Sequence, residues 1–188
     1  MALTPSVMVG LGTKAPPFAL PDVATGRTVS LWDFTQSKAL LVVFLSRHCP
    51  YVQHVKAELG RLARDYAGKG LAMVGIASND AQAYPEDSPA NLKAMIKEEG
   101  WTFPVLFDRS QEIAASYLAA CTPDYFLYDR RRRLVYRGQL DSSRPGNGIP
   151  VTGGDLREAV DAVLADRSVP SDQKPSVGCS IKWRPHID

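Results

Sequence analysis

The sequence predicts a single α/β domain, with a mixed central β-sheet flanked by helices, an N-terminal β-hairpin and a C-terminal extension. Residues 39–45 are continuously apolar, which is typical of a strand covered on both faces. Apolar residues then recur at three- and four-residue steps from Val52 to Tyr66, which indicates a helix with one buried face. A second apolar run at residues 71–77 completes a strand-helix-strand unit, for which a right-handed parallel crossover is the natural connection.

The other elements are predicted from turn signals and periodicity. Proline-punctuated segments around a Gly-containing turn predict the hairpin between residues 12 and 34. Residues 79–89 are polar and predict a loop near the strand ends, where it could border a substrate site. In chain order, the remaining elements are a helix over residues 90–99 ended by Gly100, an extended piece over 101–107, a short helix over 110–120 with Ser110 as N-cap, an antiparallel hairpin from 125–128 and 134–138, a loop over 141–154 and a helix over 154–165.

Size and charge restrict the function classes. The 188 residues, 45% of them hydrophobic, are enough for one well-filled core. Residues 1–166 are assigned to the domain, and residues 167–188, richer in Pro, Ser and Lys, to a tail that we expect to pack on the domain or on a partner subunit. The net charge of +2 is too small to predict binding to nucleic acid or to an anionic membrane, and the arginine run at 130–133 is expected to be a solvated turn.

Three widely spaced cysteines do not form the framework of a secreted disulfide scaffold. Residues 1–12 contain no basic segment followed by a long apolar one, so no signal peptide is predicted. We therefore expect a cytoplasmic, reducing setting, in which a disulfide would be transient and catalytic rather than structural.

Cys49 is predicted to cap the helix that begins at Pro50, because proline is favoured at the first helical position. Unpaired N–H groups and the positive end of the helix dipole at this place favour the thiolate, which is the reactive form of cysteine. No carboxylate occurs between Asp33 and Glu58, so we expect a positive local field from the nearby Arg47, His48, His54 and Lys56. The alternative is an inert, small apolar side chain at the start of a buried helix.

The segment Phe44-Leu-Ser-Arg-His-Cys-Pro-Tyr-Val52 resembles the active-site segment of the thioredoxin superfamily, most closely its redoxin branch, which includes the AhpC-TSA and peroxiredoxin-like proteins. Thioredoxins carry a second cysteine where this chain has Val52. Peroxiredoxins carry proline and threonine where this chain has Val42 and Ser46. The N-terminal Ala-Pro-Pro-Phe segment and the Gly-Cys-Ser-Ile-Lys-Trp ending extend the resemblance to redoxins over nearly the whole chain. It implies a thioredoxin-like fold for residues 1–166.

The resemblance also implies a second part of the site. Thr122-Pro123 matches the place of a cis-proline that packs against the active-site cysteine in the superfamily. Cys121 precedes this pair, so the fold would place its sulfur across a groove from Cys49 and let the two form a disulfide. The alternative for Cys121 is a small buried side chain beside a tight loop.

We therefore expect a thiol-disulfide oxidoreductase in which the Cys49 thiolate attacks and Cys121 resolves, with support from Arg47, His48, Pro50, Thr122 and Pro123. The alternatives are a peroxiredoxin-like peroxidase that reduces hydroperoxides, and a thioredoxin-fold redox sensor or binding module without turnover. A zinc or iron site built on Cys49, Cys121 and a histidine is a weaker possibility. The expected partners are a protein disulfide or a hydroperoxide and an external thiol reductant such as a thioredoxin, with no metal or organic cofactor. Resolution by Cys179 or by an external thiol, and the oligomeric state, stay open.

Overall fold

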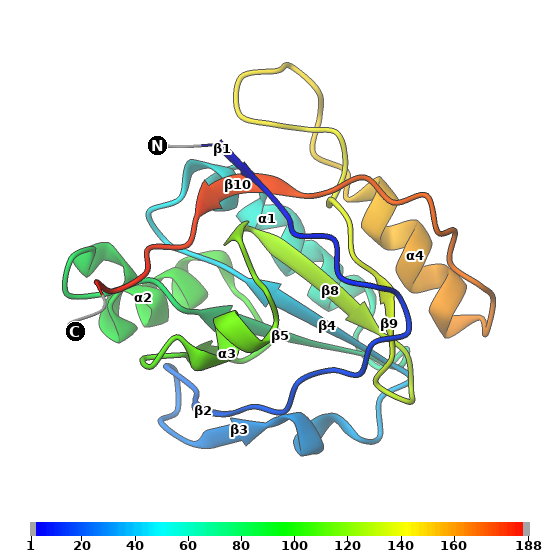
Figure 1. Cartoon of the computed structure of the whole chain (residues 1–188), viewed down its shortest axis with the longest axis horizontal. Helices are drawn as coiled ribbons and strands as arrows, with labels where there is room; N and C mark the ends of the chain where they lie inside the picture. Colours follow the sequence, from blue (N-terminus) through cyan, green and yellow to red (C-terminus); the bar gives the residue numbers. More distant parts are fainter. Residues whose placement is uncertain (1–2, 186–188) are drawn as a thin grey trace.

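A computed structural model describes residues 3–185 and has a five-stranded mixed sheet at its centre (Figure 1). Its strand order is β6-β5-β4-β8-β9, in which β4, β5 and β6 are parallel and β8 and β9 are antiparallel to their neighbours. The strands are β4 (Ala39–Phe44), β5 (Leu71–Ala77), β6 (Val105–Phe107), β8 (Asp124–Tyr128) and β9 (Leu134–Tyr136). The predicted parallel unit and the predicted antiparallel hairpin are both confirmed.

Alternate residues of β4 point into two separate cores, because successive side chains of a strand face opposite sides of a sheet. Ala39, Leu41 and Val43 lie in the core formed with three of the helices, and Leu40 and Val42 lie in the second core, with the N-terminal segment and the remaining helix. The first set of helices is α1 (Pro50–Asp65), α2 (Pro89–Glu99) and α4 (Gly154–Leu164), and the remaining helix is α3 (Glu112–Ser116). Every residue of β4 is fully buried, which explains its unbroken apolar run.

Two smaller sheets flank the central one. The predicted N-terminal hairpin is confirmed as β2 (Ala19–Pro21) paired with β3 (Thr28–Ser30), followed by the short 3₁₀ helix η1 (Leu31–Phe34). The second small sheet was not predicted and joins both ends of the chain in the order β1-β10-β7 (Figure 1). Its strands are β1 (Leu3–Pro5), β10 (Val177–Ser180) and β7 (Cys121–Thr122). The C-terminal tail therefore packs on the domain as the middle strand of this sheet.

One predicted boundary is wrong. The N-cap of α3 is Gln111, which adopts a left-handed conformation with φ of 66°, and Ser110 lies one residue earlier, where its Oγ accepts a hydrogen bond from the N–H of Glu112. The Gln111 side chain instead donates a hydrogen bond to the carbonyls of Ser78 and Lys182, so it ties β5 to the tail. Gln111 is thus held by residues far away in the sequence, and such contacts cannot be deduced from local capping preferences.

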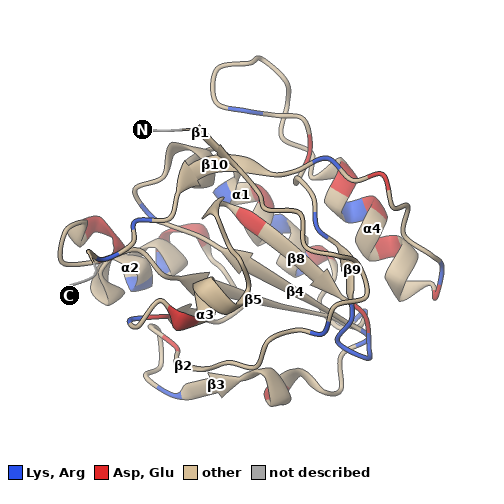
Figure 2. Cartoon of the chain, in the orientation of Figure 1, with Lys and Arg blue, Asp and Glu red and all other residues tan. Residues whose placement is uncertain are grey.

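Charged residues are mixed over the surface, with both signs on α4 and the arginine run on the turn between β8 and β9 (Figure 2). Arg130, Arg131 and Arg133 of this turn are exposed, and Arg132 is half-buried because its guanidinium binds the carbonyls of Phe34 and Ser37. Within residues 3–185, no helix is both long enough and apolar enough to cross a membrane.

Candidate active site

Cys49 lies where β4 ends and α1 begins, as the sequence predicts. It is the N-cap of α1 in an extended conformation, and Pro50 follows at the first helical position. The Cys49 side chain is fully buried, and its Sγ donates a hydrogen bond of 3.0 Å to the carbonyl oxygen of Thr122. The Thr122–Pro123 peptide bond is cis, as expected from the resemblance. The structure thus brings together Cys49, Pro50, Thr122 and Pro123.

A buried carboxylate organises the segment before Cys49. Asp87 is only 1% exposed and lies in the short 3₁₀ helix η2 (Pro85–Asp87), within the loop after β5. It accepts hydrogen bonds from the backbone N–H groups of Arg47 and His48, at 2.5 and 3.4 Å. Its other donors are the Ser46 Oγ at 2.9 Å and the Asn79 Nδ2 at 2.7 Å. The loop therefore fixes the conformation of the chain as it enters the active site.

His48 is held by the same carboxylate. Its Nδ1 lies 2.8 Å from an oxygen of Asp87, and its ring stacks on Tyr84 with centroids 5.1 Å apart. Because a carboxylate only accepts hydrogen bonds, Nδ1 carries a hydrogen, and in the neutral form of the ring the lone pair lies on Nε2. That Nε2 is buried and has no hydrogen-bond partner among the described residues. His48 therefore has one nitrogen fixed in place and one available.

Two expectations about the local charge are corrected by these contacts. Arg47 turns its guanidinium away toward α2, where it binds the carbonyl of Asn91 and the carboxylate of Glu98. The field around Cys49 is not made by basic residues alone, because Asp87 brings a buried negative charge to the segment just before it. A carboxylate this far along the chain from Cys49 cannot be found by counting charges near the cysteine.

Cys121 and Cys179 occupy different surroundings. The Cys121 Sγ lies 4.0 Å from the Oγ of Ser6 and 3.7 Å from the carbonyl of Pro123. Beside it, the fully buried Arg137 and Asp124 form an ion pair, in which one contact is 2.8 Å. Burial, followed by the charge of Asp124, raises the pKa of the Cys121 thiol well above its ordinary value. Cys121 is therefore a thiol at neutral pH.

Cys179 is 4% exposed and belongs to the same apolar core as Cys49, along with Val52, Val55 and Tyr125. Burial, followed by a side-chain hydrogen bond with Cys49, raises the pKa of Cys179 to about 12. The Gly-Cys segment of the tail is the sequence signal for this cysteine, but only the fold shows that β10 pairs with Thr122 and that Cys179 shares a core with Cys49.

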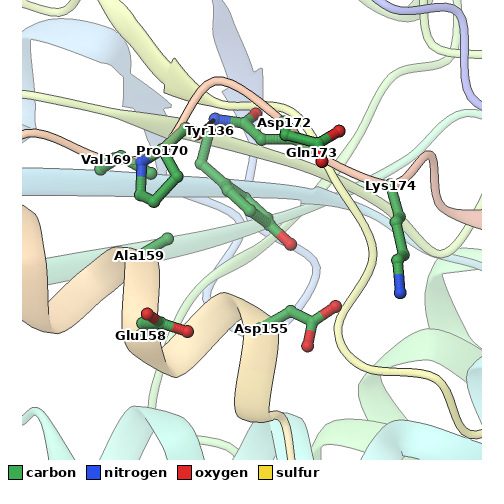
Figure 3. A pocket seen from close by; sticks show the side chains of 9 residues that line it. All are labelled: Tyr136, Asp155, Glu158, Ala159, Val169, Pro170, Asp172, Gln173 and Lys174. Atoms are coloured by element: carbon green, nitrogen blue, oxygen red, sulfur yellow. Dashed lines mark hydrogen bonds between the residues drawn. The ribbon is translucent and has the colours of Figure 1, made fainter.

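Hollows of about 510, 320 and 240 Å³ open on the molecule, and none of them is lined by these cysteines. A cavity of about 130 Å³ lies between α4 and the segment 169–174, and none of the predicted site residues lines it (Figure 3). A much smaller one of about 20 Å³ lies closer, beside Pro123, His54 and Tyr125. The zinc or iron alternative requires at least three His, Cys, Asp or Glu side chains around one point. No such group in residues 3–185 is arranged to hold a metal ion.

Solved structures share this fold. An uncharacterized conserved protein from Geobacillus kaustophilus matches with a TM-score of 0.96 and 55% identity, over 98% of each chain. A protein from Chlorobium tepidum described as a thiol:disulfide interchange protein DsbE candidate matches with a TM-score of 0.65 and 24% identity, over 84% of this chain and 99% of that one. The thioredoxin-like α/β fold is therefore shown.

Three curated relatives are more distant in sequence. Protein FixW of Rhizobium leguminosarum is 26% identical over 70% of this chain, and the match spans 62% of FixW, less than two thirds of its length. A candidate peroxiredoxin of Mycobacterium tuberculosis is 28% identical over 61% of this chain and 68% of its own. The thiol-disulfide oxidoreductase ResA of Bacillus thuringiensis is 25% identical over 66% of this chain and 67% of its own.

Two of these relatives are named for thiol chemistry, one as a candidate peroxiredoxin and one as a thiol-disulfide oxidoreductase. The model of the AhpC/TSA family matches residues 11–137, which is more than half of the chain. With the cysteine at the start of α1 and the cis-proline beside it, this match shows that the chain belongs to the AhpC/TSA family.

Proposed function

We propose that this chain is a thiol-disulfide oxidoreductase in which Cys49 is the nucleophile. The observation that carries the proposal is the position of Cys49, at the N-terminus of α1 with its sulfur on the carbonyl that precedes the cis-proline. A helix N-terminus favours a thiolate, and a thiolate is the attacking species in disulfide exchange. The similarity to ResA supports the same class of reaction.

The reaction has three steps. Cys49 loses the proton that it shares with the Thr122 carbonyl and attacks one sulfur of a substrate disulfide, which releases the other sulfur as a thiolate. A second thiol then attacks the Cys49 sulfur of the mixed disulfide and releases the reduced substrate. The sequence predicts Cys121 for this second step. An external dithiol, such as a thioredoxin, finally supplies two electrons and restores both thiols.

His48, the residue before Cys49, has an unpartnered ring nitrogen and is our candidate to handle the proton. Asp87 holds its Nδ1, as a carboxylate holds the imidazole in other enzymes that use histidine for proton transfer, and leaves the Nε2 lone pair as an acceptor. We assign His48 to proton transfer at the substrate sulfur, and Asp87 and Asn79 to its positioning.

Turnover of a small disulfide by wild type and Cys49→Ser, with a dithiol reductant, tests the proposal. Wild type should turn over, and Cys49→Ser should lose activity by at least about a thousandfold, because the nucleophile is removed. A folded Cys49→Ser protein that keeps wild-type turnover would show that the reaction does not pass through this sulfur.

The second candidate is a thiol peroxidase. The complete burial of Cys49 favours it, because hydrogen peroxide is small enough to reach a buried sulfur more easily than a peptide disulfide is. The similarity to the candidate peroxiredoxin of Mycobacterium tuberculosis supports this alternative.

Attack on the peroxide oxygen would give a sulfenic acid and release water, and a second thiol would condense with it to a disulfide. Second-order rate constants for hydrogen peroxide and for a disulfide, measured on the same protein, decide between the two. If the protein turns over neither hydrogen peroxide nor a disulfide, the remaining alternative is a redox sensor or binding module.

A further inference from the structure

The C-terminal strand β10 closes over the site. Cys179 pairs with Thr122, and Ser180 pairs with Cys121, so β10 runs antiparallel along β7 immediately before the cis-proline. The approach is close: a Cβ on Gly178 would lie 2.0 Å from the carbonyl oxygen of Thr122. Only glycine lets the two backbones come so near. The carbonyl that receives the Cys49 hydrogen bond is thus the one against which β10 packs.

The strand pairing separates the two candidate partner cysteines. Directly paired residues of an antiparallel sheet project their side chains to the same face, and the next pair projects to the other face. Cys179 pairs with Thr122, whereas Cys121 pairs with Ser180, so the two sulfurs lie on opposite faces of this small sheet. Cys179 lies in the core that contains Cys49, and Cys121 lies outside that core beside Ser6.

The influence of Cys49 on the two thiols agrees with this separation. After burial, the Cys49 side chain is the strongest of the influences that raise the pKa of Cys179 to about 12. For Cys121, the charge of Cys49 is the last and smallest of the causes, after burial, Asp124, Ser6 and Arg137. Cys49 therefore influences the Cys179 thiol more strongly than the Cys121 thiol, and Cys179 is the one that shares its core.

We propose that Cys179 is the resolving cysteine, and that β10 covers Cys49 in the reduced protein and delivers this second thiol during turnover. The proposal rests on the function proposed above. After Cys49 has formed a mixed disulfide, the Cys179 thiol gives up its proton as its sulfur attacks the Cys49 sulfur. The bond between Cys49 and the substrate sulfur breaks, the substrate leaves as a thiolate that takes up a proton, and a Cys49–Cys179 disulfide forms. The substrate disulfide has then been reduced by two electrons.

Access to Cys49 requires β10 to move. Cys49 is fully buried, and β10, which pairs with the residue that receives its hydrogen bond, is only four residues long. The tail is anchored beyond β10, where Lys182 receives a hydrogen bond from the N–H of Asp80 and gives one to Asn79. Because β10 also pairs with β1 along its other edge, residues 177–180 would lift from β7 together with residues 3–5, while the Lys182 anchors hold the end of the tail.

The test maps disulfides in wild type, Cys121→Ser and Cys179→Ala after one equivalent of glutathione disulfide, with acid quenching and alkylation of free thiols. Wild type and Cys121→Ser should both yield the Cys49–Cys179 peptide. Cys179→Ala should keep glutathione on Cys49, and its turnover should fall at least about tenfold, because the resolving step is lost. Alanine is used at 179 because the side chain is buried in an apolar core.

A Cys49–Cys121 peptide in wild type, or loss of the Cys49–Cys179 peptide in Cys121→Ser, would overturn the assignment of Cys179. Glutathione released from Cys179→Ala at the wild-type rate would overturn it too. None of these results would contradict the proposal that Cys49 is the nucleophile. That proposal is contradicted only if Cys49→Ser reduces the disulfide as well as wild type does. Mapping of wild type needs no substitution, so the assignment can be rejected even if a variant does not fold.

Discussion

The Cys49 sulfur donates its hydrogen bond to the carbonyl of Thr122, over 3.0 Å. Thr122 is also the residue that pairs with Cys179 in β10. One peptide unit therefore connects the nucleophile, the cis-proline and the C-terminal strand. Any change that moves β10 should change the exposure and the reactivity of Cys49.

Gly178→Ala should lift β10 without removing any sulfur. The new methyl group would overlap the Thr122 carbonyl oxygen, at 2.0 Å, and its carbon, at 2.7 Å. Backbone cannot give way as a flexible side chain can, so the strand should separate from β7. We expect Cys49 in this variant to be alkylated by iodoacetamide at least about tenfold faster than in wild type, because local opening then costs less free energy.

Gly10→Ala is the matched control, because Gly10 is exposed and its new Cβ would meet only the Thr13 Oγ1, at 3.8 Å. Its alkylation rate should equal that of wild type. If Gly178→Ala and Gly10→Ala react at the same rate, β10 does not limit access to Cys49.

Asp87→Asn should weaken both the fold and the site. An amide nitrogen cannot accept hydrogen bonds, so some of the donors from Ser46, Arg47, His48 and Asn79 would lose their partner in a buried place. The expected loss is about 3 kcal/mol in the free energy of unfolding, measured with urea. Turnover should fall as well, because His48 is no longer held.

Glu86→Gln changes the neighbouring exposed carboxylate and serves as the control. It should unfold at the same urea concentration as wild type. Equal stability of Asp87→Asn and Glu86→Gln would mean that the hydrogen bonds to Asp87 contribute little to the fold.

The fold could be predicted from the sequence because it follows local patterns. The apolar run of β4, the spacing along α1 and Pro50 after Cys49 each depend on a few neighbouring residues. The family resemblance supplied the cis bond before Pro123. Local signals of this kind fix elements and their order, and therefore the place of Cys49.

The rest of the site depends on contacts between distant segments. Asp87 reaches the Ser46–His48 segment only because β4 and β5 lie side by side, which brings the loop after β5 next to the end of β4. Cys121 is nearer to Pro123 in sequence than Cys179 is, and the sequence therefore favours it as the partner. The pairing of β7 and β10 places the Cys179 side chain on the opposite face from that of Cys121, and no pattern within the tail reveals this pairing.

Val52→Cys should rescue the loss of Cys179. Val52 is fully buried in the core that holds Cys49 and Cys179, and it stands at the position of the second thioredoxin cysteine. In a Cys179→Ala background, Val52→Cys should raise disulfide turnover roughly tenfold, because a resolving thiol is again in reach. Val52→Ala in the same background is the control for the smaller side chain. No gain over Val52→Ala would show that a thiol at this position cannot reach the mixed disulfide.

Asp141 should make stability depend on acid pH. Burial raises the pKa of this carboxyl, but hydrogen bonds from Ser143, Gly153 and Thr152 outweigh it and hold the pKa below its ordinary value. A lowered folded-state pKa means that Asp141 stabilises the fold fully above its unfolded pKa of about 3.9, and that this contribution is lost as the pH falls through the folded value. Asp141→Asn should lose about 2 kcal/mol at neutral pH.

The stability of Asp141→Asn should also fall less than that of wild type when urea unfolding is repeated at pH values from about 5 down to about 2. The exposed Asp166 gives the control Asp166→Asn, whose curve should follow wild type. Parallel curves for wild type and Asp141→Asn would argue against a stabilising role of the Asp141 charge.

The most direct test of the account is the identity of the thiol that stays free when the wild-type protein is oxidised. The protein is treated with one equivalent of glutathione disulfide, unfolded in acid and labelled with a maleimide, and the labelled cysteine is located by mass spectrometry. The account predicts label on Cys121 alone, since Cys49 and Cys179 are then joined. Label on Cys179 with Cys121 protected, or label on Cys49, would contradict it.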